Sequence, residues 1–114
     1  MYLVHGPDGR AELLALFSRL NCDVREFVSA QAFLAEYRPG TGRCLVFKWN
    51  GCAADGLGLL ERLQERHPRL PVIVLAARGT VPIAVRAMRA GAAAFLESPW
   101  ARGLLLKEIR RFLD

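Results

Sequence analysis

The stretch that decides the fold of this 114-residue chain is LPVIVLAARGTVPIAVRAMRAGAAAFLESPW, residues 70–100. It opens with the apolar run Val72-Ile73-Val74-Leu75, continues as an amphipathic segment over about 81–90, and closes with Ala93-Ala94-Phe95-Leu96. Near-continuous apolar runs are typical of strands that are buried on both faces, and the segment between them has the pattern of a helix. The stretch therefore predicts two strands of a parallel sheet with a helix between them.

Turn and cap residues agree with these boundaries. Pro82 falls in the first helical turn, where its missing N–H would have had no intrahelical partner, and Gly91 fits a left-handed helix end. Earlier in the chain, we expect Ser29 to be an N-cap and Pro39-Gly40 to break the helix that Ser29 begins.

The same alternation of apolar runs and amphipathic segments occurs five times along the chain. We expect strands near residues 2–4, 24–28, 45–47, 72–75 and 93–96, and helices over about 9–20, 29–37, 55–66, 81–90 and 100–112. Strands that alternate with helices in this way predict one compact α/β domain, (βα)5, over residues 1–114.

Composition excludes several classes of protein. Hydrophobic residues make up 53% of the chain and charged residues 24%, which is typical of a globular domain. No run approaches the ~18 apolar residues of a spanning helix, and the N-terminus lacks the pattern of a secretion signal, so we expect a cytoplasmic protein that does not enter a membrane. Cys22, Cys44 and Cys52 have no metal or disulfide spacing and are interpreted as reduced thiols.

The net charge of +5 comes almost wholly from arginines that are scattered along the sequence. Scattering indicates a solvated surface, with local concentrations over residues 86–89 and 107–111. No nucleic-acid recognition motif is present, so contact with DNA is expected only through a separate output domain.

The candidate site follows from topology, because ligands of open α/β sheets gather beyond the carboxyl ends of the strands. The residues expected at that edge are His5 and Gly6 after the first strand, Lys48 after the third, Ala76 and Ala77 after the fourth, and Ser98 after the fifth.

The chain resembles the receiver domains of bacterial response regulators, and among them the FixJ-like branch. Residues 70–100 are similar to the family pattern LPVI…TGxGDVPxAVxAMKAGAxDFLEKPF, and residues 28–34, VSAQAFL, are similar to ASAxxFL. The resemblance spans essentially the whole chain. It implies a flavodoxin-like, doubly wound parallel sheet with strand order 2-1-3-4-5 and a cis peptide bond before Pro99.

At every position that the family uses for phosphorylation, this sequence departs from the pattern. Members hold Mg²⁺ with acidic residues after the first strand, accept phosphate on an aspartate after the third, and use a hydroxyl and a lysine after the fourth and fifth. Here these positions hold His5-Gly6-Pro7, Lys48, Ala76 and Ser98. Phe95 falls at the family's switch aromatic, but Ala76 has no hydroxyl to couple to it. We expect neither Mg²⁺ nor any other cofactor, and no phosphorylation.

Several of these residues have two interpretations. Lys48 either extends its stem over apolar neighbours and keeps its ammonium in water, or pairs with Asp8 or Glu97. His5 is interpreted as structural in preference to a metal ligand or a phosphoacceptor, and Asp8 and Asp55 as helix-start residues. Trp49 and Trp100 either fill the space of the absent metal and phosphate or anchor a partner.

The sequence therefore predicts a degenerate, aspartate-less receiver that is not an enzyme. It would act through protein–protein interaction or homodimerisation, as the N-terminal part of a transcriptional regulator whose output domain follows residue 114 or is absent. The alternatives are a ligand or redox sensor, with Cys52 as the redox candidate, and a receiver phosphorylated at an atypical residue. The interaction surface is expected on the fourth helix, fifth strand and fifth helix, at Ile83, Val85, Arg86, Arg89, Ala94, Lys107 and Arg110.

Overall fold

The computed structural model describes residues 1–5, 10–20, 23–38, 44–48, 53–67, 69–76, 81–97 and 102–113, with the backbone alone at 10, 53–57, 81–84 and 102. Strands and helices alternate along these residues. Their order is β1 Tyr2–Val4, α1 Arg10–Phe17, β2 Arg25–Phe27, α2 Ala30–Glu36, β3 Leu45–Lys48, α3 Ala53–Arg66, β4 Val72–Ala76, α4 Val81–Arg89, β5 Ala94–Glu97 and α5 Arg102–Leu113. None of the helices in these ranges is long and apolar enough to cross a membrane.

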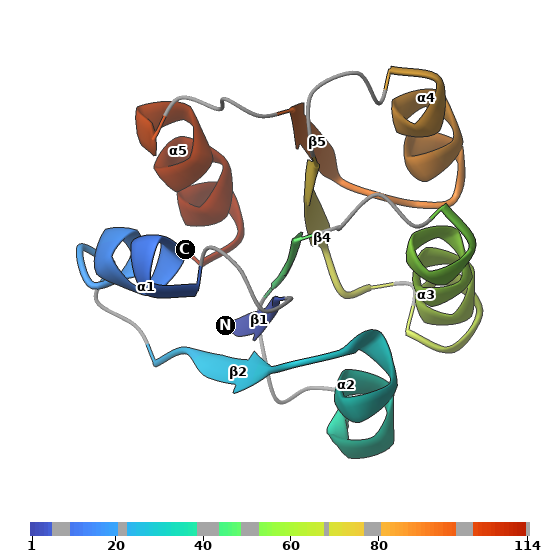
Figure 1. Cartoon of the computed structure of the whole chain (residues 1–114), viewed down its shortest axis with the longest axis horizontal. Helices are drawn as coiled ribbons and strands as arrows, with labels where there is room; N and C mark the ends of the chain where they lie inside the picture. The colour runs from blue at the N-terminus through green and yellow to red at the C-terminus, as the bar shows by residue number, and fades with distance from the viewer. Residues whose placement is uncertain are drawn as a thin grey trace.

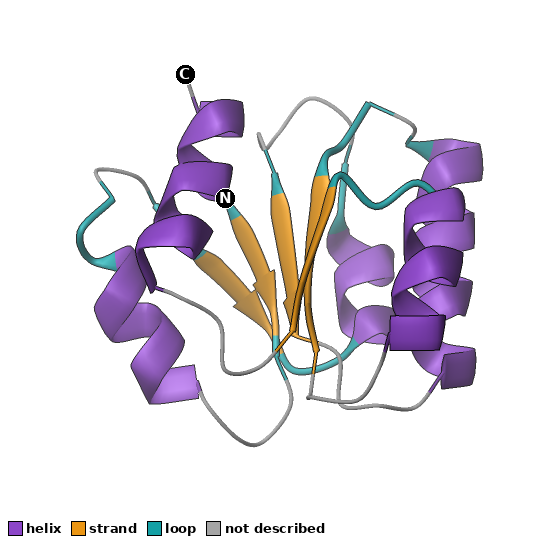
Figure 2. Cartoon of the chain, turned by 90° about the horizontal axis from the view of Figure 1, so that it is seen from above, coloured by secondary structure: helices purple, strands orange, loops and turns teal. Residues whose placement is uncertain are grey.

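The five strands form one parallel sheet in the order β2-β1-β3-β4-β5, which confirms the predicted fold and strand order. Helices α1 and α5 cover one face of the sheet, and α2, α3 and α4 cover the other (Figure 1). Figure 2 shows that the chain begins, and α5 ends, at the end of the sheet where the strands begin. Each helix therefore runs back against its preceding strand.

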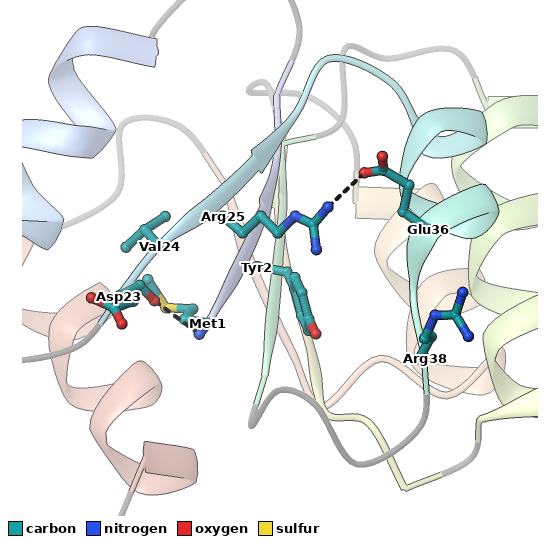
Figure 3. A pocket seen from close by; sticks show the side chains of 7 residues that line it. All are labelled: Met1, Tyr2, Asp23, Val24, Arg25, Glu36 and Arg38. Carbon is teal, nitrogen blue, oxygen red and sulfur yellow. Dashed lines mark hydrogen bonds and ion pairs between the residues drawn. The ribbon is translucent and has the colours of Figure 1, made fainter.

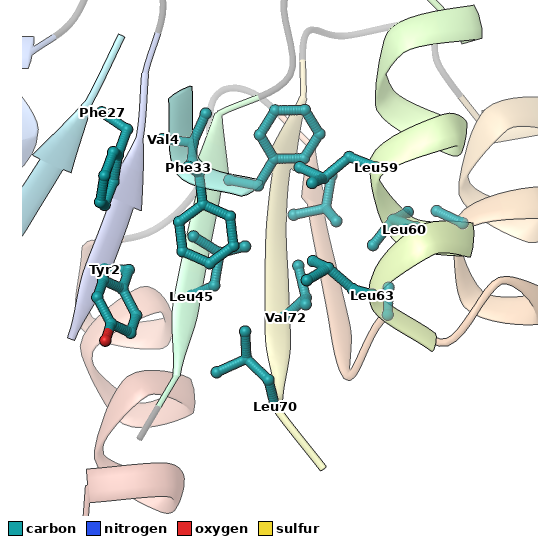
Figure 4. Close-up of a cluster of buried hydrophobic side chains, with 14 of the residues drawn as sticks. Tyr2, Val4, Phe27, Phe33, Leu45, Leu59, Leu60, Leu63, Leu70 and Val72 are labelled. Atoms are coloured by element: carbon teal, nitrogen blue, oxygen red, sulfur yellow. The ribbon is translucent and has the colours of Figure 1, made fainter. Parts of the chain in front are cut away.

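Successive side chains of each strand point to opposite faces of the sheet, so the hydrophobic core has two parts. In β1, Tyr2 and Val4 enter the core under α2 and α3, whereas Leu3 enters the core under α1 and α5. Strand β4 is buried along its whole length because both of its faces are covered. Figure 4 shows the first of these cores.

A group of aromatic rings joins the short helix α2 to the edge of the sheet. Phe33 is fully buried, and its ring centroid lies 5.4 Å from that of Tyr2, 5.3 Å from Phe27 and 5.1 Å from Tyr37. Burial raises the pKa of the Tyr37 hydroxyl above its usual value, and the nearby Tyr2 adds to the rise. A helix of seven residues is marginal by itself, so this packing is what stabilises α2.

The predicted boundaries are right for most elements and wrong by two or three residues at some ends. Helix α1 ends at Phe17 and not at residue 20, because the N–H groups of Arg19 and Leu20 bond to carbonyls three residues back. Helix α3 begins two residues earlier than expected, and α5 begins two residues later. The N-cap is confirmed, since the Ser29 hydroxyl accepts a hydrogen bond from the Ala32 N–H at 3.1 Å.

Helix α4 ends in a Schellman motif, as its glycine predicted. The Ala92 N–H donates to the Ala87 carbonyl at 3.0 Å, and the Gly91 N–H donates to the Met88 carbonyl at 3.2 Å. Gly91 has φ +108°, in the region that favours glycine, and Ala92 and Ala87 are both buried beneath the turn. This end directs the chain into β5.

We expect Gly91→Ala to lower the free energy of unfolding by about 1–2 kcal/mol, the typical cost of forcing an L-residue into left-handed backbone. The added Cβ would also overlap the Gln64 side chain. Urea denaturation followed by circular dichroism measures the change.

Gly58→Ala in α3 and Gly103→Ala in α5 are matched controls, because a Cβ at either position meets nothing within 4 Å. Both should raise stability by roughly 0.5–1 kcal/mol, as replacing a helical glycine does. Equal effects at all three positions would mean that the end of α4 does not depend on its glycine.

Candidate functional site

All five parallel strands end at one edge of the sheet, and the predicted site residues lie at the ends of four of them. Lys48 is the last residue of β3 and pairs with Leu75, while Ala76 is the last residue of β4 and pairs with Glu97 at the end of β5. His5 directly follows β1. The predicted residues Gly6, Pro7, Ser98 and Pro99, with the cis bond expected before Pro99, lie outside the described residues, as do Asp8, Cys52, Trp49, Ala77 and Trp100.

His5 is a buried residue that ties β1 to the edge strand β2. Its side chain is 6% exposed, and its Nε2 lies 3.2 Å from Oε1 of Glu26, which is 28% exposed. Its backbone N–H donates to the Phe27 carbonyl at 3.0 Å. These contacts agree with a structural histidine, since a buried polar side chain needs a partner of this kind.

Lys48 lies beside this pair. In the register of β1 and β3, Val4 pairs with Phe47, so extending it by one residue places His5 next to Lys48. Lys48 is half-buried, which both interpretations of this residue allow. The partner of its ammonium stays a prediction, because Asp8 is outside the described residues.

Ala76 and Phe95 belong to the core on the other side of the sheet. Ala76 is buried, and Phe95 is partly buried and packs against the same core. The methyl group at Ala76 cannot donate a hydrogen bond, so it cannot act as the family's hydroxyl does.

Three of the predicted positions at this edge carry side chains that are not magnesium ligands. Mg²⁺ prefers carboxylate and other oxygen ligands in octahedral geometry, whereas His5, Lys48 and Ala76 offer an imidazole, an ammonium and a methyl group. Among the described residues, no three His, Cys, Asp or Glu side chains are grouped so as to hold a metal ion. Two carboxylates also lie at this edge, that of Glu26 against His5 and that of Glu97 at the end of β5.

Glu26 is the residue of this edge that sequence reasoning missed. It lies between Arg25 and Phe27 in a strand of only three residues, a pattern typical of an ordinary solvated edge strand. Only the pairing of β1 with β2 shows that it contacts His5. The strand order implied by the resemblance places β2 beside β1, so a polar residue in β2 could have been recognised as a possible partner of His5.

Comparison with known proteins gives a consistent result. A family model for the response regulator receiver domain matches residues 6–110. The transcriptional regulatory protein FixJ from Azorhizobium caulinodans is 34% identical over 114 residues, which cover 99% of this chain and 54% of FixJ. The chain spans about half the length of the curated relatives that it matches from end to end.

Solved structures agree in fold. A response regulator receiver protein from Pseudoalteromonas atlantica has a TM-score of 0.83 at 32% identity, covering 98% of this chain and 93% of that one. The receiver domain of NtrX from Brucella abortus has a TM-score of 0.83 at 28% identity, covering 99% of this chain and 98% of that one.

We expect Glu26→Ala to destabilise the domain by about 1–3 kcal/mol, because it removes the carboxylate that faces the buried imidazole of His5. Glu36→Ala is the matched control, since it breaks a pair with Arg25 in which both side chains are more than half exposed. Such an exposed pair is typically worth about 0.2–1 kcal/mol. Urea unfolding of both variants tests this, and a loss no greater for Glu26→Ala than for Glu36→Ala would contradict it.

Proposed function

The chain belongs to the family of response regulator receiver domains, and from this premise we propose that it is a receiver that works without phosphorylation. On this proposal it is a protein-interaction or dimerisation module in bacterial signalling and the N-terminal part of a transcriptional regulator. The second part is supported by the similarity to FixJ, which is a transcriptional regulatory protein.

The observation that carries the proposal is Lys48 at the end of β3. Transfer of phosphate to a receiver needs a carboxylate nucleophile at that position, with cations to neutralise the phosphoryl group. The Lys48 ammonium can supply charge, but it cannot form an acyl phosphate. Of the described neighbours, His5 is buried against Glu26 and Ala76 is buried in the core with no group that could accept phosphate.

The surface formed by α4, β5 and α5 is the proposed interaction face. On α4, Val85 is 51% exposed and Met88 48%, and the exposed Arg86 and Arg89 lie beside them. On α5, Leu104 is 44% exposed. Apolar side chains with an arginine rim are typical of the centre and border of an interface.

The other predicted residues of this face contribute unequally. Lys107 and Arg110 are exposed on α5, whereas Ala94 is partly buried against the core and offers little surface. Met88 was not predicted, and the side chain of Ile83 lies outside the described residues. A symmetric dimer would bring the arginines of two copies together, so we propose a weak homodimer that salt strengthens, or an acidic partner protein.

We expect no phosphate on the protein after incubation with acetyl phosphate and Mg²⁺, measured by intact mass against a receiver that has its aspartate. Lys48→Asp should not restore efficient labelling, because residues of such a site act as a unit and restoring one of them is far from additive. Rapid Mg²⁺-dependent labelling of the wild-type chain would refute the proposal, as would its saturable tryptophan fluorescence response to millimolar Mg²⁺. Labelling of Lys48→Asp alone would show instead that other residues of the site, such as Asp8, still support the reaction.

We expect Arg86→Glu/Arg89→Glu to change self-association or capture of an acidic partner, because both side chains border the proposed face. Sedimentation at several ionic strengths measures self-association. Arg66→Glu/Arg69→Glu is the control, since it makes the same change of charge on exposed residues at and after the end of α3. If self-association and partner capture are the same in wild type and the α4 variant, the interaction face lies elsewhere.

A further inference from the structure

Arginines that are scattered in the sequence are brought to one edge of the folded domain. Each helix runs back against its preceding strand, so helices end and strands begin at the same edge of the sheet (Figure 2). Exposed arginines lie at these points on every side of the sheet. We call them the basic edge: Arg19 after α1, Arg25 at the start of β2, Arg38 after α2, Arg66 at the end of α3, Arg69 before β4, and Arg111 in the last turn of α5.

Helix capping explains only part of this arrangement. A cation in the last turn of a helix is favourable against the helix dipole, which accounts for Arg66 and Arg111. Arg25 and Arg69 lie in or before strands, and Arg38 lies beyond the end of α2. The helix dipole does not account for these three positions, and Arg25 instead pairs with Glu36 and lies over the Phe27 ring at 5.4 Å.

Carboxylates at the same edge neutralise the arginines only in part. Arg25 pairs with Glu36 at 3.1 Å and Arg111 with Glu108 at 2.8 Å, and both arginines stay about 60% exposed, at 61% and 59%. Arg19, Arg66 and Arg69 have no ion-pair partner among the described residues. The edge therefore keeps a positive surplus on guanidinium groups that are open to solvent.

Arg25 and Arg38 also border a cleft at this edge (Figure 3). The cleft has a volume of about 310 Å³, and Asp23 and Glu36 line it together with the two arginines, so its charge is mixed. Its Arg25–Glu36 pair is exposed and so holds together weakly, which lets an incoming anion take the place of Glu36. The cleft lies opposite the strand ends that hold Lys48, and so gives no support to a sensor that uses that site.

We propose that the basic edge binds the phosphate backbone of nucleic acid without reading its sequence. Guanidinium groups match phosphate oxygens in a planar, two-pronged geometry, which an ammonium does not. The arginines come from elements on both faces of the sheet, in a domain measuring 32 × 32 × 25 Å, and do not converge on one pocket. Such spacing suits a polymer with regularly repeated charges better than a short acidic peptide.

This proposal goes beyond the function proposed above, because it uses the edge opposite Lys48 and does not depend on the state of the phosphorylation site. Binding of this type is weak and depends strongly on salt, typically with a Kd of about 10⁻⁴–10⁻⁶ M at physiological ionic strength. Each phosphate contact that is lost lowers the slope of log K against log salt by about 0.9 for duplex DNA.

Fluorescence anisotropy with two duplex DNAs of unrelated sequence, at about 50 to 200 mM salt, tests the proposal. We expect equal affinity for both duplexes, and a loss of about tenfold or more with a shallower salt slope in Arg66→Glu/Arg69→Glu. Gln31→Glu/Arg62→Glu/Gln64→Glu makes the same change of net charge on exposed residues within α2 and α3, and should retain most of the binding. Circular dichroism confirms that each variant is folded.

Three outcomes would overturn the proposal. The first is no binding by wild type at the lowest salt. The second is an equal loss in the edge and control variants, which would show that net charge alone attracts DNA. The third is binding of poly-glutamate at the basic edge without binding of DNA, which would identify the ligand as an acidic protein segment.

Discussion

The requirement that both faces of a parallel sheet be buried governs the rest of this structure. Strands such as β4, which are apolar along their whole length, are stable only when helices cover them on both sides. Each connection therefore contains a helix that packs on one face of the sheet and leads the chain back to the edge where the strands begin. This single constraint brings the ends of β1, β3, β4 and β5 together at one edge and the ends of the helices together at the other.

At the first edge, the constraint places side chains of unusual chemistry side by side. His5, buried against Glu26, and the half-buried Lys48 lie at the strand ends where, on our proposal, other receivers carry out phosphoryl transfer. A lysine cannot replace the carboxylate that accepts phosphate, because an ammonium cannot form an acyl phosphate. In our proposal the family's fold is kept without its chemistry, and a surface that recognises other molecules is the use that remains for it.

At the second edge, the same constraint brings positively charged side chains together. The arginines are far apart in the sequence, where they indicate an evenly solvated surface. In the folded domain Arg19, Arg38 and Arg69 all lie near the beginnings of strands, because the helices or loops that carry them return there. The domain thus has two candidate surfaces, the face of α4 and α5 and the basic edge, which separate charge variants can distinguish.

The sequence by itself determined the alternation of strands and helices and the Ser29 and Gly91 caps, because these depend on local pattern. It also determined that Lys48, His5 and Ala76 lie at strand ends, because parallel strands all end at the same edge of a sheet. The ends of helices and strands were less predictable. After Phe17, for example, the backbone N–H groups bond to carbonyls three residues back, and the hydrophobic pattern of the sequence does not indicate such a change. Only the tertiary structure decided that Glu26 contacts His5 and that distant arginines share an edge. Both arrangements depend on which strands are neighbours and on where each helix ends. They bring together residues that are far apart in the sequence, where no local pattern indicates that they will meet.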